Sequence, residues 1–461
     1  MLEGVSRMRK HLALCVLLIA PAAFAQAPGT NTAANENAAL EQKIRDLEDR
    51  IVALEGQVRI LKSQPGASAA PGVTQAQPAP AAPTPSPTST EATAQAGVQT
   101  APQEPVRLGG AGTAAAKALN PDISMIGDFI ATTGQNHVLS APVMEMHESE
   151  LGVQAIIDPY ARGDFFLSFG EEGVNLEEGF ITFTALPGGI VAKAGKMRSA
   201  FGKVNTLHNH VLPWIDRPVV SGNLVGGEDG IDDAGFSVTR ILPAPKGLFL
   251  EGTGQLFRGD SSDVFKSSQR SDVSVVGHLR GYGDISESTN LDLGVSYARG
   301  HNDLGSAFTT SLYGIDATLR YKPLRRAIYK SFVGRGEFIW SQRQQPVGSA
   351  CLPGTCPSGI APNFQRAFGF YTSADYQFAR RWFLGGRLDR SGRARDARIT
   401  DDGTSIVLTY WPSEFAQVRG QYRFTRYGAP ISTLSPPGKE DANELLMQIQ
   451  FSLGAHGAHP F

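Results

Sequence analysis

The feature that most constrains the fold is an alternation of apolar and polar residues near the C-terminus. Across residues 444–454, Leu445, Met447, Ile449, Phe451 and Leu453 alternate with Leu446, Gln448, Gln450 and Ser452. A period of two places these two sets on opposite faces of a β-strand. One face is apolar without a polar interruption, as contact with lipid requires, and the other is able to face water.

The same alternation recurs between Asp122 and Gly454, separated by Gly, Asp, Asn, Ser and Pro. The clearest further examples are residues 150–157, 291–298, 312–321 and 417–424. Charged residues occupy the second face of many of these strands, which suits a water-filled lumen better than the core of a soluble sandwich, the competing interpretation. We therefore predict an all-β fold over 120–461: a transmembrane antiparallel β-barrel of about 16 strands, the size that leaves an aqueous channel.

Aromatic residues near the predicted strand ends favour the same topology. They are expected to form the girdles at the two membrane interfaces, and comprise Tyr297, Tyr321, Trp340, Trp382, Tyr410, Trp411 and Tyr427. No run of about 20 apolar residues predicts a membrane-spanning helix in the processed chain.

The N-terminal residues have the features of an export signal. Arg7, Arg9 and Lys10 precede an apolar stretch, and Ala23-Phe24-Ala25 forms a small-x-small cleavage site, so residues 1–25 are a predicted signal peptide. Export leaves Cys351 and Cys356, close together in a Pro/Gly-rich loop, and one small disulfide is the simplest prediction for them.

Residues 36–63 are predicted to form a short coiled coil. The apolar residues follow heptad spacing, at Leu40, Ile44, Leu47, Ile51, Leu54, Val58 and Leu61. A single amphipathic helix on the barrel rim is the alternative. Ile and Val at the a positions favour dimers, whereas the stretch from Arg50 to Glu55 resembles a motif of trimeric coiled coils, and we favour a trimer. Residues 64–119 are rich in Ala and Pro and predict a disordered periplasmic linker.

The alternation stops between Gly195 and Gly227. This segment is too long for a hairpin turn, and we predict a loop that folds inward and narrows the lumen. Its candidate constriction residues are Phe201, Lys203, His208, His210 and Arg217. The spacing of His208 and His210 also permits a metal site, with Asp216 or Glu228 as a further ligand, although a pore-lining or hydrogen-bonded role is the simpler interpretation.

Charge is distributed unevenly along the predicted barrel. Residues 121–190 contain eleven acidic residues and one basic residue, whereas 320–430 contain eighteen basic and seven acidic residues. Successive strands occupy successive sectors of a closed barrel, so the two excesses should lie on different sides of the lumen. The predicted pore-lining arginines would attract anions; they are Arg320, Arg335, Arg387, Arg419 and Arg423. The overall net charge of -2 gives no argument for a nucleic-acid partner.

One part of the interrupted segment resembles a known family. The run from Gly195 to Gly202, with Lys196, Arg198 and Phe201, followed by Asp216-Arg217, is similar to a pattern of the phosphate-selective porin O and P family. The resemblance implies a trimeric, sixteen-stranded outer-membrane channel in which arginine ladders and a lysine cluster guide anions. The arginines are present here, and no lysine cluster is evident in the sequence.

Two further features predict partners of such a barrel. Phe451 and the C-terminal Phe461 resemble the signal by which the barrel-assembly machinery recognises outer-membrane barrels. Arginines near 390–398 suit the phosphates of lipopolysaccharide beside the outer-membrane lipid. The predicted location is therefore the bacterial outer membrane, with the N-terminal segment in the periplasm and a homotrimeric assembly.

The function predicted from these features is a porin for passive diffusion of small hydrophilic, anionic solutes, a form of ion transport. Two alternatives stay open: a metal (zinc) or siderophore receptor resembling the TonB-dependent class, and a structural barrel that tethers the envelope through the coiled coil. We predict no cofactor and no enzymatic activity, because no G-x-S-x-G motif or spaced catalytic triad occurs.

Overall fold

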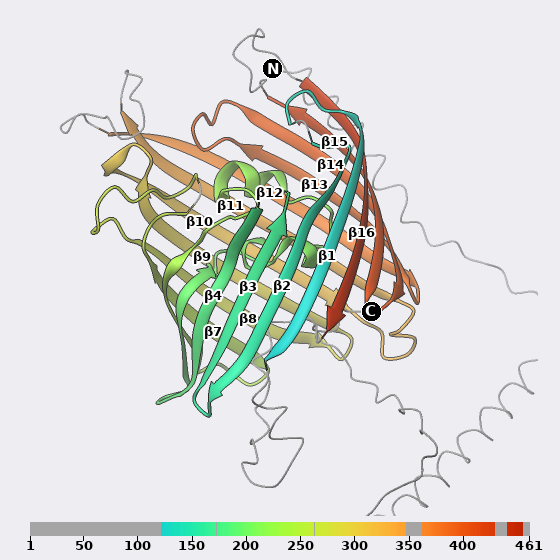
Figure 1. Ribbon diagram of the computed structural model, residues 1–461, viewed down its shortest axis with the longest axis horizontal. Helices are drawn as coiled ribbons and strands as arrows, with labels where there is room; N and C mark the ends of the chain where they lie inside the picture. The colour runs from blue at the N-terminus through green and yellow to red at the C-terminus, as the bar shows by residue number, and fades with distance from the viewer. Residues whose placement is uncertain are drawn as a thin grey trace, which may run out of the picture. The chain divides into compact units, whose positions relative to one another are not determined.

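The fold was taken from a computed structural model, which describes residues 121–139, 141–171, 173–261, 263–346, 362–428 and 440–454. Within these residues sixteen antiparallel strands form a closed barrel, in which β1 pairs with β16 (Figure 1). This confirms the predicted architecture and strand number. The strands are β1 (Asp122–Gln135), β2 (Met144–Asp158), β3 (Ala161–Gly170), β4 (Gly173–Leu186), β5 (Ile190–Arg198), β6 (Asp232–Leu242), β7 (Leu248–Phe257), β8 (Ser274–Ser286), β9 (Thr289–Asn302), β10 (Gly305–Tyr321), β11 (Ser331–Pro346), β12 (Pro362–Ala379), β13 (Trp382–Gly392), β14 (Thr400–Ser413), β15 (Ala416–Tyr427) and β16 (Glu440–Gly454).

Strand β16 shows why the alternation closes into a barrel. Leu445 and Leu453 are 53% and 58% exposed on the outer surface, whereas Gln448 and Gln450 are 1% and 2% exposed on the inner one. Outward apolar side chains recur on the other strands, for example Leu293 and Val295 on β9 and Ile406 and Leu408 on β14, so the outer surface is largely apolar. An apolar exterior on a barrel without sheet edges is the arrangement that crosses a lipid bilayer. Among the described residues, no helix has the length and apolarity needed to span a membrane.

The connections differ between the two ends of the barrel. At the end where β1 starts, turns are mostly tight, as at residues 159–160 and 380–381. At the opposite end the connections at 136–143, 199–231 and 258–273 are much longer. Short turns at one rim and long loops at the other are typical of outer-membrane barrels.

Part of the predicted aromatic set faces outward, as an interfacial girdle requires, although Tyr297 and Trp340 lie inside β9 and β11 and not at their ends. Tyr297, Trp340 and Trp382 lie on the outer surface and are 36%, 39% and 38% exposed. The prediction was wrong for Trp411 and Tyr427, which are each 7% exposed and point inward. Side chains alternate between the two faces of a strand, and both residues fall at positions whose side chains point inward. The presence of an aromatic near a strand end does not by itself decide which face it takes.

The connection between β5 and β6, residues 199–231, folds back inside the barrel (Figure 1). We call it the inner segment. It contains the short helices η1 (Val204–Thr206), η2 (Asn209–Val211) and η3 (Ser221–Val225). Its apolar side chains pack against inward residues of the strands, so the barrel has a small hydrophobic core in its bore. Trp214, fully buried, meets the Tyr371 ring edge-on at 5.2 Å.

Several predicted features lie outside the described residues. They are the signal peptide 1–25, the coiled coil 36–63, the linker 64–119, the Cys351–Cys356 disulfide and the C-terminal Phe461. Phe451, the other residue of the predicted insertion signal, lies on the outer face of β16 and is 43% exposed.

Candidate functional site

The inner segment starts at a tight backbone turn. Gly202 has a φ of +61°, a left-handed conformation that favours glycine, and a Cβ there would lie 3.1 Å from Glu337 Oε1. The backbone N–H of Gly202 donates to Ser296 Oγ at 2.9 Å, and the N–H groups of Lys203 and Val204 donate to Glu337 Oε1. These bonds fasten the start of the segment to β9 and β11.

Two side chains hold the segment together internally. Asn205 donates to the carbonyls of Ser199 and Ile231, at 3.0 and 3.1 Å, and thereby joins the two ends of the segment. Arg217 donates to the carbonyls of Val204 and Leu207, at 3.1 and 2.6 Å. Burial and the nearby Arg198 lower the pKa of Arg217 to about 10. Arg217, predicted as a constriction residue, therefore acts as a clamp within the segment.

The far side of the segment is anchored on inward arginines of β13 and β15. Asp216 Oδ2 lies 2.9 Å from Arg387 Nη2 and 3.0 Å from Arg423 Nη1. Gln421 completes this anchor, because it donates to the Asp216 carboxylate and accepts from the backbone N–H of Ile215 at 2.8 Å. Burial raises the pKa of Asp216, but the charges of the two arginines outweigh it, so that the pKa lies well below its ordinary value.

All five predicted pore-lining arginines lie on the inner face, and four contact carboxylates. We call this set, Arg320, Arg335, Arg387, Arg419 and Arg423, the basic wall. Arg387 also pairs with Asp389 at 2.7 Å, Arg423 with Glu444 at 2.5 Å and Arg335 with Asp375. Arg320 lies 4.0 Å from Asp292. Arg419 donates to two neutral groups, Thr409 Oγ1 at 3.3 Å and Gln448 Oε1 at 3.0 Å.

The side of the bore formed by β1, β2 and β4 is acidic, and two β-bulges shape it. In β2 the register shifts opposite Asp128 and Phe129, which leaves His147 as the extra residue. In β4 it shifts opposite Phe166 and Leu167, which leaves Glu177 as the extra residue. A bulge re-aims side chains, so each strand turns two successive side chains toward the bore. We call the resulting set the acidic wall: Asp128, Glu148, Glu150, Glu177 and Glu178.

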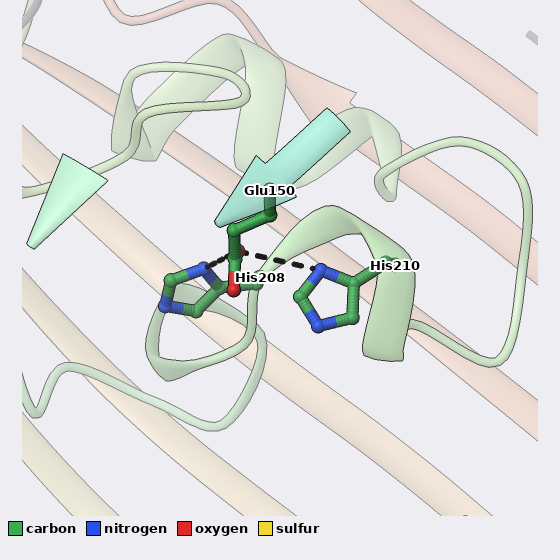
Figure 2. A group of neighbouring side chains, drawn as sticks. All are labelled: Glu150, His208 and His210. Atoms are coloured by element: carbon green, nitrogen blue, oxygen red, sulfur yellow. Dashed lines mark hydrogen bonds and ion pairs between the residues drawn. The ribbon is translucent and has the colours of Figure 1, made fainter. Parts of the chain in front are cut away.

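Two histidines of the inner segment reach into the acidic wall. His208 Nδ1 lies 2.6 Å from Glu150 Oε2 and 3.1 Å from Glu177 Oε2, while its Nε2 lies 2.8 Å from Glu178 Oε2. His210 Nδ1 lies 3.5 Å from the same Glu150 oxygen, so that this carboxylate sits between the two imidazoles (Figure 2). Burial lowers the pKa of His208, but the three carboxylates outweigh it and raise the pKa well above its ordinary value.

Cations of the barrel bind carboxylates of the acidic wall and of the inner segment beside it. Arg198 Nη2 lies 3.1 Å from Glu177 Oε2, and its backbone N–H donates to Glu178 Oε1 at 2.7 Å. His147 Nε2 lies 3.3 Å from Glu228 Oε1. Hydrogen bonding to His147 is the main cause that keeps the pKa of Glu228 below its ordinary value.

The structure changes the carboxylates that accompany the predicted histidine pair. The two predicted carboxylates lie elsewhere: Asp216 pairs with arginines of the basic wall, and Glu228 pairs with His147. Glu150 of β2 lies between His208 and His210 instead. Sequence reasoning did not single out Glu148, Glu150, Glu177 and Glu178 as a site. The signal that pointed toward them was the excess of acidic residues between 121 and 190.

Phe201 and Lys203, the remaining predicted constriction residues, lie at the start of the inner segment. Phe201 is 1% exposed and packs in the hydrophobic core of the bore. Lys203 Nζ reaches Asp292 Oδ2 at 3.2 Å. Both side chains therefore fasten the segment to the strands.

We compared the chain with known proteins. No family model matches it. An uncharacterized protein of Aquifex aeolicus (strain VF5) is 27% identical, over 75% of this chain and 81% of the relative.

Solved structures with a similar arrangement are outer-membrane proteins. The anion-selective porin from Comamonas acidovorans has a TM-score of 0.48 and 11% identity, covering 72% of this chain and 99% of the porin. The outer-membrane channel DcaP of Acinetobacter baumannii has a TM-score of 0.47 and 11% identity, covering 72% and 96%.

Proposed function

We propose that this protein is an outer-membrane channel through which small hydrophilic solutes diffuse passively. The observation that carries the proposal is the sixteen-stranded closed barrel with an apolar outer band and charged or polar inward side chains. A barrel of about 16 strands is wide enough for an aqueous passage, which smaller barrels fill with side chains. The proposed solutes travel between the inner segment and the strands that it leaves uncovered.

The inner segment is the proposed constriction. It is fastened to β9 and β11 through Gly202 and Lys203, to β13 and β15 through Asp216, and to β2 and β4 through His208. A segment tied to strands around the bore reduces the open cross-section without closing the barrel wall. Its position is the reason to expect a conductance lower than that of an empty barrel of the same size.

The predicted preference for anions rests on the basic wall. Carboxylates lie beside four of its five arginines, and this pairing reduces the positive charge that a passing solute meets. The acidic wall adds negative charge to the same bore, and its Asp128 is linked to Arg419 through Gln448. We therefore propose a channel with weak charge selectivity, and a marked anion preference remains a prediction from the sequence alone.

The residues that resemble the phosphate-selective porins are structural anchors here. Arg198 donates to the carbonyls of Glu228 and Asp229, at 2.9 and 3.1 Å, Phe201 is buried, and Asp216 binds the basic wall. The motif thus supports a similar placement of the inner segment. It supports no particular solute.

The two alternative functions are less well supported. Outer-membrane transporters with a plugged lumen have about 22 strands, so a sixteen-stranded barrel favours a diffusion channel over a TonB-dependent-like receptor. The tethering function depends on 36–119, outside the described residues. A homotrimer, lipopolysaccharide and the barrel-assembly machinery stay predicted partners.

Planar-bilayer recording with the purified mature chain tests the proposal. We expect stepwise single-channel currents in potassium chloride and a reversal potential close to zero in a salt gradient. Asp216→Ala, which releases one anchor of the inner segment, should raise or destabilise the conductance. Absence of current steps from folded, heat-modifiable protein would contradict the proposal, and a strongly anion-selective reversal potential would restore the sequence-based prediction.

A further inference from the structure

We propose that Glu150, His208 and His210 form a binding site for a divalent transition-metal ion, with Glu177 and Glu148 beside it. The site lies in the bore, where the inner segment meets β2 and β4. It goes beyond passive diffusion, because it assigns the channel a specific ligand.

The ligand atoms converge on one position. The ring nitrogens of His208 and His210 and a carboxylate oxygen of Glu150 all lie within 4.8 Å of one another. Around a tetrahedral Zn²⁺ ion, ligand atoms about 2.1 Å from the metal lie about 3.4 Å apart. The 3.5 Å between His210 Nδ1 and Glu150 Oε2 matches this value. The 2.6 Å between His208 Nδ1 and the same oxygen is shorter than this value, so these two atoms would have to move apart by about 0.8 Å to share an ion.

The surroundings of His208 are those of a metal-ligating histidine. Its Nδ1 faces Glu150, and its Nε2 lies 2.8 Å from Glu178 Oε2. A histidine that binds a metal through one ring nitrogen typically donates the other N–H to a carboxylate, which orients the ring. Arg198, at 3.1 Å, holds Glu177 beside the site in the same manner.

A second observation, on Glu148, supports a cation at this position. Glu148 is 6% exposed, and in the part of the chain that the structure describes no N–H or O–H group donates to its carboxylate oxygens, which lie against Glu177. Carboxylate oxygens of Glu148, Glu150 and Glu177 lie within 4.8 Å of one another. Buried carboxylates at such separations repel each other unless a proton or a cation lies between them.

The donor set indicates the class of metal. Two imidazole nitrogens with carboxylate oxygens suit Zn²⁺ and its neighbours Co²⁺, Ni²⁺ and Cu²⁺, whereas Ca²⁺ and Mg²⁺ prefer oxygen ligands alone. A bound ion would join the inner segment, through both histidines, to strand β2. We therefore expect it to hold the segment more firmly in the bore.

Isothermal titration of the full mature chain with Zn²⁺, after removal of metal by EDTA, tests the proposal. We expect one saturable site, and Ca²⁺ should give no heat above the detergent blank. Glu150→Gln, His208→Ala and His210→Ala should each weaken binding at least tenfold. His278→Ala is the matched control, because His278 also points inward but contacts Ser296 Oγ, at 2.8 Å, and should leave binding unchanged.

Two further measurements keep the test decisive. His456→Ala/His459→Ala removes the histidines of the C-terminal tail, and binding should survive. Co²⁺ should give a visible absorption band that His210→Ala abolishes, while heat-modifiability shows that the variant is folded. No Zn²⁺ binding by the parent chain, or equal binding by the three site variants, overturns the proposal. Conductance in EDTA is recorded separately, so its loss would contradict the channel and not the metal site.

Discussion

The two charged walls of the bore hold the same inner segment in different ways. At the basic wall, Asp216 of the segment lies between Arg387 and Arg423, and each arginine has a second carboxylate of its own. At the acidic wall, His208 and His210 meet several glutamates, and Glu148 lies against Glu177 with no N–H or O–H donor to its oxygens among the described residues.

This difference separates charged side chains that only hold the structure together from charged side chains that are able to bind a ligand. A buried ion pair whose lone pairs and protons are all used is complete within the chain. A buried carboxylate without a partner is costly in the folded state, and a bound cation removes that cost. The basic wall therefore anchors the inner segment, whereas the acidic wall both anchors the segment and forms the proposed binding site.

The largest expected effect comes from breaking the anchor at the basic wall. Asp216→Ala leaves two buried arginine side chains short of a partner, and we expect it to lower the free energy of unfolding by about 3–5 kcal/mol. Urea unfolding in detergent, followed by tryptophan fluorescence, measures it. Asp396→Ala, which removes an exposed pair with Arg398 at 2.8 Å, is the control and should change little. Equal effects of the two substitutions would contradict the anchor.

The pH dependence of the same anchor follows from the depressed pKa of Asp216. A carboxylate whose folded pKa lies below its unfolded value stabilises the fold at every pH above the unfolded value. That contribution is lost as the pH falls through the folded value. The stability difference between the parent chain and Asp216→Asn should therefore stay constant from pH 7 to pH 5 and shrink below about pH 4. A difference that already shrinks between pH 7 and pH 5 would be inconsistent with this anchor.

At the acidic wall, replacing one carboxylate should raise the free energy of unfolding, whereas at the basic wall it lowers it. Glu148→Gln removes repulsion with Glu150 and Glu177, and in EDTA we expect the free energy of unfolding to rise by about 1 kcal/mol. Glu178→Gln weakens a partner of His208 and should lower it. The same urea unfolding at pH 8 compares the two variants. If both variants lose stability, Glu148 is not repelled by its neighbouring carboxylates, and the prediction is wrong.

The smallest effect is expected at Arg419, which has only neutral hydrogen-bond partners among the described residues. Arg419→Gln should cost about 1 kcal/mol of stability. It should also move the reversal potential in a salt gradient toward cations, because it removes positive charge that no carboxylate contacts. Arg335→Gln, which frees Asp375 as well, should move it further. A smaller shift for Arg335→Gln than for Arg419→Gln would contradict the expected effect of freeing Asp375.

Much of the architecture was predictable because it depends on neighbouring residues. The alternation in 444–454 set which side chains of β16 face lipid, and the recurring pattern led to the sixteen strands. The interruption between Gly195 and Gly227 marked the inner segment for the same reason. The face to which a side chain points is a local property of a strand, because successive side chains point to opposite faces of the sheet.

The site itself was decided by the closed barrel. Two bulges, at His147 and Glu177, broke the strict alternation and brought the glutamates together, and nothing in the local pattern marked them. Asp216 and Arg387 meet across 171 positions of sequence, and His208 and Glu150 across 58. Which distant side chains meet depends on strand register and on where the inner segment crosses the bore. By itself, then, the sequence determined which side chains face lipid, while the tertiary structure decided which charges inside the barrel are neutralised and which remain to bind an ion.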